Sequence, residues 1–225
     1  MQPIGGIDRS LPQLIYQQLR EEIINGRILP GTKLRETLLA DSLKVSRIPL
    51  REAIPMLEAE GFVTSQPRRG AVVNQLTRRD VDELYAVRGA LEPLAAELAA
   101  ARVGSDGAHL LRELRAAIDR ERTAVATGDD ADIASESSDV HLSVVLLADN
   151  NLLTRMMRQI SGRARWLTRL TSPRDSHSAL DDHELLFAAI ERGDGAEARR
   201  ISADHIASGR RNSLEMIGDT LPEQA

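Results

Sequence analysis

Cysteine is missing from all 225 residues of the chain. Its absence excludes disulfide bonds and thiolate zinc sites, and it fits the reducing environment of the cytoplasm. No apolar run approaches the roughly 20 residues that a membrane-spanning helix needs. The first residues also lack the basic stretch and apolar core of a secretory signal. We therefore expect a cytoplasmic protein with no membrane partner.

Charge is divided unevenly along the chain, whose formal net charge is −5. Residues 1–75 carry ten Lys and Arg against eight Asp and Glu, whereas residues 76–225 carry 19 against 26. The first part has a net charge of +2 and the second a net charge of −7. Because DNA presents phosphates, the basic first part is the one expected to meet nucleic acid.

Between Arg35 and Gly70 the sequence has the pattern of helix, tight break, helix and hairpin. In the second helix Leu50, Ile54 and Leu57 recur at the spacing of a buried stripe, and Ser46 is placed to cap its start. Two short extended runs follow, joined by a Pro-Arg-Arg-Gly turn. This order is typical of a winged helix-turn-helix, which suits a DNA major groove.

Arg47 and Arg51 lie four residues apart on another face of that second helix. A solvated face would explain them, but their place at the start of the helix, with Arg69 and its neighbouring arginine on the wing, favours contact with phosphate or bases. Pro55 interrupts the pattern because it removes a backbone hydrogen bond. We expect the helix either to bend there or to end before Met56.

From Thr77 onward the apolar residues follow the periodicity of long helices. Breaks rich in Gly, Asn and Pro divide this part into about six helices. The approximate spans are 77–103, 105–128, 130–148, 151–171, a fifth helix ending at 193, and 195–217. The sequence therefore predicts a mainly α protein, with a winged helix-turn-helix at residues 1–75 and an all-helical bundle at residues 76–225.

His141, His183 and His205 lie on three different predicted helices, and each continues an apolar stripe. Three inward imidazoles from separate helices can converge on one metal ion. The alternative is that each is a hydrogen-bonded core histidine, and spacing alone does not decide between the two.

Arg88 lies in the middle of an apolar seam on the first long helix. A buried arginine needs a partner. Glu92, one turn further on, is one candidate, and the carboxylate of a ligand is the other. Both interpretations remain open at this point.

Two sets of motifs resemble those of a known family. The N-terminal signature is similar to that of GntR-family bacterial transcription regulators, in the segments Leu38-Leu39-Ala40, Val45-Ser46-Arg47-Ile48-Pro49-Leu50-Arg51-Glu52-Ala53, Leu57-Glu58-Ala59-Glu60-Gly61 and Arg69-Gly70. The C-terminal part resembles the FadR-type effector domain (FCD), in its shorter VanR-like branch. Its markers are Leu84-Tyr85-x-x-Arg88-x-x-x-Glu92, His141 followed by Asn150, and His183 followed by Asp194 and His205.

The resemblance implies a homodimer, assembled through the helical domains, on a two-fold symmetric DNA operator. It also implies DNA contacts near the helix-turn-helix and the wing, and we assign these to Arg35, Thr37, Ser46, Arg47, Pro49, Arg51, Arg69 and Gly70. Thr37 stands where some members of the family carry a DNA-contacting arginine.

The resemblance further implies a metal held by the three histidines and by an aspartate four residues before the first. Ser137 occupies that fourth position here, so a protein ligand is missing from the expected set. Zn or Ni is the expected ion because imidazole suits both. A small carboxylate is the expected effector, with Arg88, Ser137 and Asn150 as its expected contacts.

The sequence is therefore interpreted as a ligand-responsive transcription regulator, a repressor rather than an enzyme. A metal-dependent hydrolase that activates water on the three histidines is one alternative, although no general base can be assigned to the cluster by spacing. A constitutive DNA binder with a vestigial pocket is the other.

Overall fold

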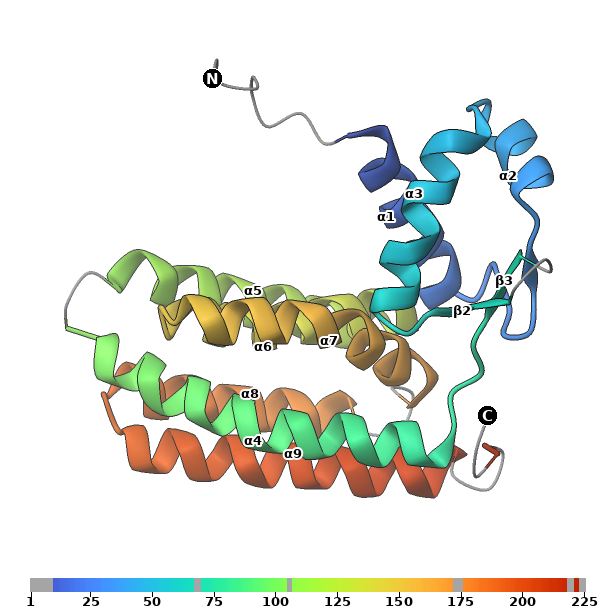
Figure 1. Cartoon of the computed structure of the whole chain (residues 1–225). Coiled ribbons are helices and arrows are strands. Elements are labelled where there is room, and N and C mark those ends of the chain that lie inside the picture. The colour runs from blue at the N-terminus through green and yellow to red at the C-terminus, as the bar shows by residue number, and fades with distance from the viewer. Residues whose placement is uncertain (1–9, 67–69, 105–106, 172–175, 218–220, 223–225) are drawn as a thin grey trace, which may run out of the picture. The chain divides into compact units, whose positions relative to one another are not determined.

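The computed structural model describes residues 10–66, 70–104, 107–171, 176–217 and 221–222 (Figure 1). The chain separates into two compact units, Met1–Gln75 and Leu76–Ala225. Helix is the main element of both units, as the sequence predicts. No helix in the described ranges is long and apolar enough to cross a membrane.

The first unit is a winged helix-turn-helix. Its elements, in chain order, are α1 (Leu11–Ile24), β1 (Lys33–Leu34), α2 (Glu36–Leu43), α3 (Arg47–Ala59), β2 (Val63–Gln66) and β3 (Gly70–Val73). The strands form an antiparallel sheet in the order β1-β3-β2, with Val63 opposite Val73. The break between α2 and α3 is a left-handed turn at Lys44, whose φ is 54°.

Helix α3 packs its predicted apolar stripe inward. Leu50 and Leu57 are fully buried and Ile54 is 8% exposed, and α3 contacts α1. The helix continues through Pro55 to Ala59, so the expectation that it ends before Met56 is wrong. Because proline has no N–H, the carbonyl of Arg51, one turn earlier, loses its intrahelical partner.

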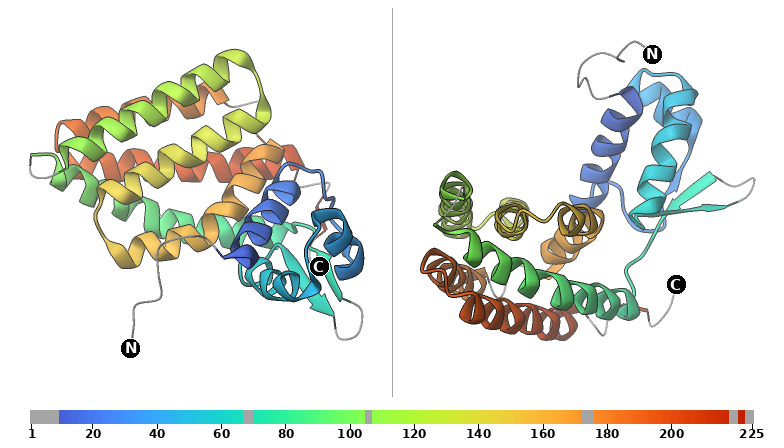
Figure 2. Two further views of the ribbon diagram at one scale, coloured as in Figure 1. Left: turned by 90° about the horizontal axis from the view of Figure 1, so that it is seen from above. Right: turned by 60° about the vertical axis from the view of Figure 1, so that its left-hand side comes forward.

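The second unit contains six helices in its described part, which agrees with the number predicted. They are α4 (Arg78–Arg102), α5 (Ala108–Thr127), α6 (Asp130–Leu147), α7 (Asn151–Thr171), α8 (Ser176–Glu191) and α9 (Gly195–Ile217). They form two layers, α5–α6–α7 and α4–α8–α9 (Figures 1 and 2). The apolar core of this unit lies among all six helices.

Local signals in the sequence explain two of the ends of these helices. Thr77 and Asp80 form the predicted capping box at the start of α4. Gly128 ends α5 in the left-handed conformation, with a φ of 76°. The predicted start of α5 at Ser105 lies outside the described residues, and in the structure α5 begins at Ala108.

Candidate functional site

The first unit has a groove between the helix-turn-helix and the sheet. Its volume is about 590 Å³. Five of the residues expected to contact DNA line it, namely Arg35, Thr37, Arg47, Arg51 and Gly70. Segments from α2, α3 and the wing therefore present these residues on one concave surface.

Glu36 lies between the two arginines of α3 and was not singled out from the sequence. Its Oε2 accepts hydrogen bonds from Arg47 Nη2 at 3.2 Å and from Arg51 Nε at 2.8 Å. Burial opposes ionisation of this carboxyl, but the two arginines outweigh it and lower its pKa. Because Arg47 and Arg51 are each more than half exposed, both guanidinium groups remain accessible to phosphate.

The remaining residues expected at the DNA surface are placed differently. Ser46 is the exposed N-cap of α3, but its hydroxyl makes no capping hydrogen bond within the described residues. Pro49 is buried on the side of α3 that faces the core of the unit. It costs the helix no hydrogen bond there, because N–H groups of the first turn have no intrahelical acceptor. Arg69 lies outside the described residues.

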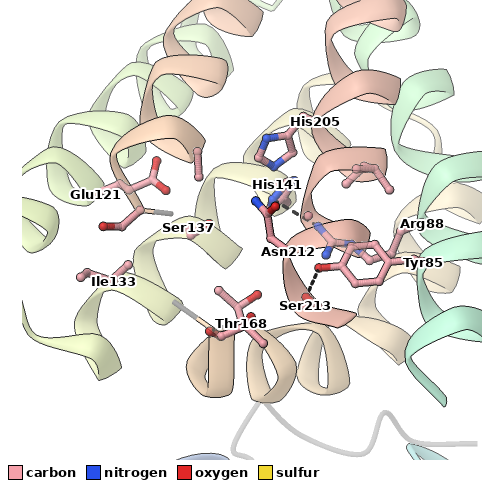
Figure 3. Close-up of a pocket in the computed structure, with 15 residues that line it drawn as sticks. Tyr85, Arg88, Glu121, Ile133, Ser137, His141, Thr168, His205, Asn212 and Ser213 are labelled. Atoms are coloured by element: carbon pink, nitrogen blue, oxygen red, sulfur yellow. Dashed lines mark hydrogen bonds between the residues drawn. The ribbon is translucent and has the colours of Figure 1, made fainter. Parts of the chain in front are cut away.

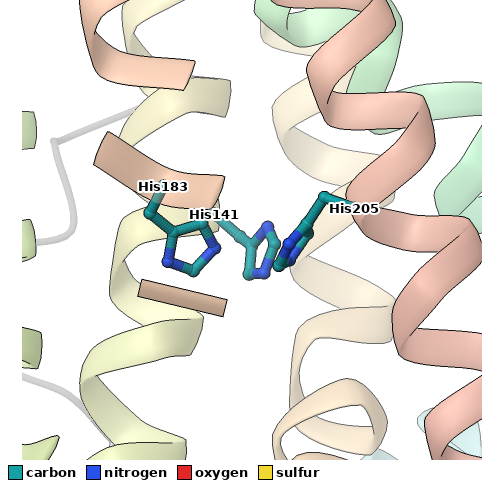
Figure 4. A group of neighbouring side chains, drawn as sticks. All are labelled: His141, His183 and His205. Carbon is teal, nitrogen blue, oxygen red and sulfur yellow. The ribbon is translucent and has the colours of Figure 1, made fainter. Parts of the chain in front are cut away.

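In the second unit the three predicted histidines converge (Figure 4). His141 of α6, His183 of α8 and His205 of α9 have one ligand nitrogen each within 4.8 Å of the others. The centroids of their rings are 4.7 to 5.2 Å apart. The structure thus brings together residues that are up to 64 positions apart in the sequence.

Each imidazole is held at its Nδ1 atom by a carboxylate. The distances are 2.8 Å from His141 to Glu92, 2.7 Å from His183 to Glu121 and 3.0 Å from His205 to Asp182. A carboxylate on Nδ1 fixes the orientation of the ring and makes Nε2 the nitrogen that would bind a metal, as in carboxylate–histidine–zinc arrangements. Each of the three imidazoles is therefore oriented by a carboxylate.

The partners and protonation of the imidazoles bear on whether the cluster could bind a metal. His183 is 1% exposed, and its Nε2 has no hydrogen-bond partner in the described part of the chain. Burial lowers the pKa of His141 to about 4, and burial also lowers the pKa of His205. These two imidazoles are consequently neutral at pH 7, which is the state that binds a metal.

Arg88 connects this cluster to α4. Its Nε lies 2.6 Å from Glu92 Oε1, and its Nη2 lies 3.2 Å from His141 Nε2. Its guanidinium also lies over the ring of Tyr85, 5.3 Å from the centroid. Burial opposes ionisation of Glu92, but Arg88 and His141 outweigh it and hold its pKa far below the usual range. The pairing with Glu92 considered from the sequence is thus present.

A cavity of about 80 Å³ opens beside the cluster (Figure 3). Arg88, His141 and His205 line it, so it meets both the guanidinium and the imidazoles. Most of the other lining side chains carry hydroxyl or amide groups, and these are Tyr85, Ser137, Thr168, Thr171, Ser176, Asn212 and Ser213. Such a lining suits a small polar ligand with several hydrogen-bonding groups.

The remaining residues of the expected effector site are placed as follows. Ser137 is buried and lines the cavity, as Glu121 does. Asp139, two residues further on, is exposed and lies 3.8 Å from Arg120, so it points away from the cluster. Asn150 caps α7 by accepting a hydrogen bond from the N–H of Leu153 at 3.1 Å, and it does not line the described cavity.

Two residues that hold the cluster were missed from the sequence. Glu121 stands between two arginines, which is typical of a solvated face, but it also lies three residues after Ile118 and four before Val125 on the buried stripe of α5. That position on the buried stripe indicates that Glu121 faces the core. The sequence gives no such indication for Asp182, because its contact with His205 joins α8 to α9.

A winged helix-turn-helix with an arginine-lined groove, followed by a separate helical unit, defines a DNA-binding transcriptional regulator. Residues 11–73 match the bacterial regulatory proteins of the gntR family, and residues 83–208 match the FCD domain. The chain belongs to the GntR family of transcriptional regulators, in the group that carries an FCD domain. It is therefore a regulator and not an enzyme, and the hydrolase alternative is wrong.

Relatives of similar length support this family. The chain is 32% identical over 188 residues to the gluconate operon transcriptional repressor of Bacillus licheniformis, covering 79% of this chain and 74% of that protein. It is 28% identical to the HTH-type transcriptional repressor GlaR of Escherichia coli K12, covering 85% and 90%. Its fold is similar to a GntR transcriptional regulator from Rhodococcus sp. RHA1, with a TM-score of 0.79 at 24% identity over 92% of this chain and 99% of that one.

Proposed function

We propose that this GntR-family regulator is a homodimeric, cytoplasmic repressor whose operator binding responds to a small carboxylate in the helical cavity. Each monomer offers one winged helix to a half-site of a two-fold symmetric operator. The groove lined by Arg35, Arg47 and Arg51 supports this role because three cationic side chains can meet phosphates and base edges together.

The observation that carries the proposal is the convergence of three imidazoles, two of which line a cavity in the helical unit. The donor set fits a divalent metal such as Zn²⁺ or Ni²⁺. His183 has a buried Nε2 without a partner among the described residues, and each Nδ1 is fixed by a carboxylate. His141, His183 and His205 would hold the ion, which when bound supplies a positive centre for a carboxylate oxygen.

The residues of the chain itself select the effector class. Arg88 lines the cavity beside the imidazoles, and its positive charge favours a carboxylate oxygen there. The hydroxyl-rich lining favours a carboxylate that also bears hydroxyl groups. Ser137 lines the same cavity, while Asn150 would act by holding the start of α7 in place.

To change operator binding, the effector must bind one arrangement of the dimer better than another. Binding in the helical unit would then alter the spacing of the two recognition helices, and operator binding would in turn alter effector affinity by the same factor. The coupling between the operator site and the effector site can therefore be measured from either side.

An operator selected from a random duplex library would be titrated with full-length protein, with and without Zn²⁺, against a panel of hydroxy- and dicarboxylates. The panel includes gluconate because of the operon named for the Bacillus licheniformis relative. We expect at least one carboxylate to change operator affinity five-fold or more, the lower range of allosteric coupling. If none does, the proposal that a carboxylate in the cavity controls operator binding is wrong.

A further inference from the structure

Glu121 of α5 is a buried carboxylate with an unusual set of neighbours. It is 1% exposed, its Oε2 lies 2.7 Å from His183 Nδ1, and it lines the cavity together with Ser137. Among the described residues its ion-pair partner is His183. Glu92, which is also buried, has instead a permanent cation, because Arg88 lies 2.6 Å away.

The charge of Glu121 therefore needs an explanation. A carboxylate taken out of water is costly unless a cation or several hydrogen bonds compensate it. Glu121 has the imidazole of His183 beside it but no guanidinium or ammonium within ion-pair distance in the described part of the chain. A divalent cation bound among the three imidazoles would supply the missing positive charge.

The position of Ser137 indicates which expected group the charge of Glu121 replaces. Ser137 lies one helical turn before His141, where the family resemblance predicts an aspartate ligand. Ser137 of α6 and Glu121 of α5 line the same cavity (Figure 3). The anionic group that is missing from α6 is thus matched by a carboxylate that α5 places against His183, in the lining of the same cavity.

We propose that Glu121, held against His183, supplies the negative charge of the metal centre in place of an aspartate at position 137. This inference rests on the metal site proposed above. Glu121 acts as a positioning and charge-balancing residue through His183. It fixes the ring so that Nε2 is free for the ion, and it offsets part of the charge of a cation whose three ligands are neutral.

The test is a calorimetric titration of the full-length protein with Zn²⁺ and with Ni²⁺, using a competing chelator. Glu121→Gln keeps the size of the side chain and should weaken metal affinity 10- to 100-fold, the usual effect of losing a group that orients a ligand. Glu184→Gln is the matched control. It removes a carboxylate from the same α5–α8 contact, where Glu184 lies 2.7 Å from Arg115, and should leave metal affinity within about two-fold.

The deciding variant is the combination of Glu121→Gln with Ser137→Asp. If charge is what Glu121 contributes, an aspartate one turn before His141 should restore most of the lost affinity. Ser137→Asp alone should tighten binding less than it does in the Glu121→Gln background, because two adjacent carboxylates repel. A role in folding alone would give no such rescue, and thermal unfolding of each variant checks the fold.

Three outcomes would overturn the inference. Glu121→Gln could bind metal as tightly as wild type while His183→Ala binds none, which would leave the proposed metal site standing without Glu121. Glu121→Gln could weaken binding without rescue by Ser137→Asp, which would show that Glu121 only orients the ring. Wild type could bind neither ion, and then the metal site itself is wrong and the inference fails with it.

Discussion

Replacing Arg51 by alanine should separate DNA binding from stability. Its Nε lies 2.8 Å from Glu36, but its side chain is 59% exposed, and exposed ion pairs stabilise a fold by about 0 to 1 kcal/mol. The free energy of unfolding should therefore fall by at most about 1 kcal/mol. A good contact to a base contributes about 1 to 3 kcal/mol of binding free energy. In a homodimer each half-site loses that contact, and distant sites add, so the operator complex should lose at least about 2 kcal/mol, roughly thirty-fold in Kd.

Fluorescence anisotropy with a selected operator at fixed salt measures this loss, and chemical denaturation measures the stability. Arg79→Ala is the matched control because it removes the same charge and an exposed ion pair, with Glu83, on α4 outside the groove. The control should bind the operator within about two-fold of wild type. If Arg51→Ala also binds with wild-type affinity, Arg51 does not contact DNA and the assignment of α3 as the recognition helix is wrong.

Three further predictions concern the two units. A fragment of residues 1–75 should bind a palindromic operator at least about 100-fold more weakly than the full chain, because it lacks the proposed dimer interface; equal affinity in a gel shift would contradict dimerisation through the helical unit. Asp80→Asn should lower stability by about 1 kcal/mol at pH 7 through loss of the capping box and the contact with Arg163. Although burial opposes it, hydrogen bonds from Thr77 and Arg163 lower the pKa of Asp80. The contribution of Asp80 to stability is therefore present above its unfolded pKa of about 3.9 and is lost as pH falls through its folded pKa. Urea unfolding at pH 7 and at pH 3 should therefore show that the Asn variant loses less stability on acidification than wild type. Arg88→Met should cost about 3 to 5 kcal/mol in the same assay because it leaves Glu92 buried without its cation; a loss below about 1 kcal/mol would show that His141 alone compensates Glu92.

Much of the fold could be predicted because its determinants are local. The stripe of Leu50, Ile54 and Leu57 identifies the buried face of α3, and the bounds of α7 and α9 follow from turn residues beside periodic apolar residues. Pro55 shows where local reasoning fails. Packing of the stripe against α1 keeps α3 helical through a residue that removes a backbone hydrogen bond.

The site could be predicted only in part because it depends on contacts between helices. Periodicity indicates that His141, His183 and His205 face inward, but it does not show that they meet. Glu121 stands beside His183 only because α5 and α8 pack together, and Glu36 lies between two arginines only because α2 and α3 meet at a turn. Such pairings are set by tertiary packing, which spacing within one helix does not specify.

X-ray absorption spectroscopy of the Zn²⁺-loaded protein tests the central claim most directly, because it counts the ligands of the ion. The proposed site predicts one ion per chain with three imidazole nitrogens at about 2.0 to 2.1 Å. In His183→Ala the same measurement should find no ordered three-imidazole site. An ion bound without imidazole, or the same spectrum from wild type and His183→Ala, would show that the three histidines are core residues and that any effector is recognised without a metal.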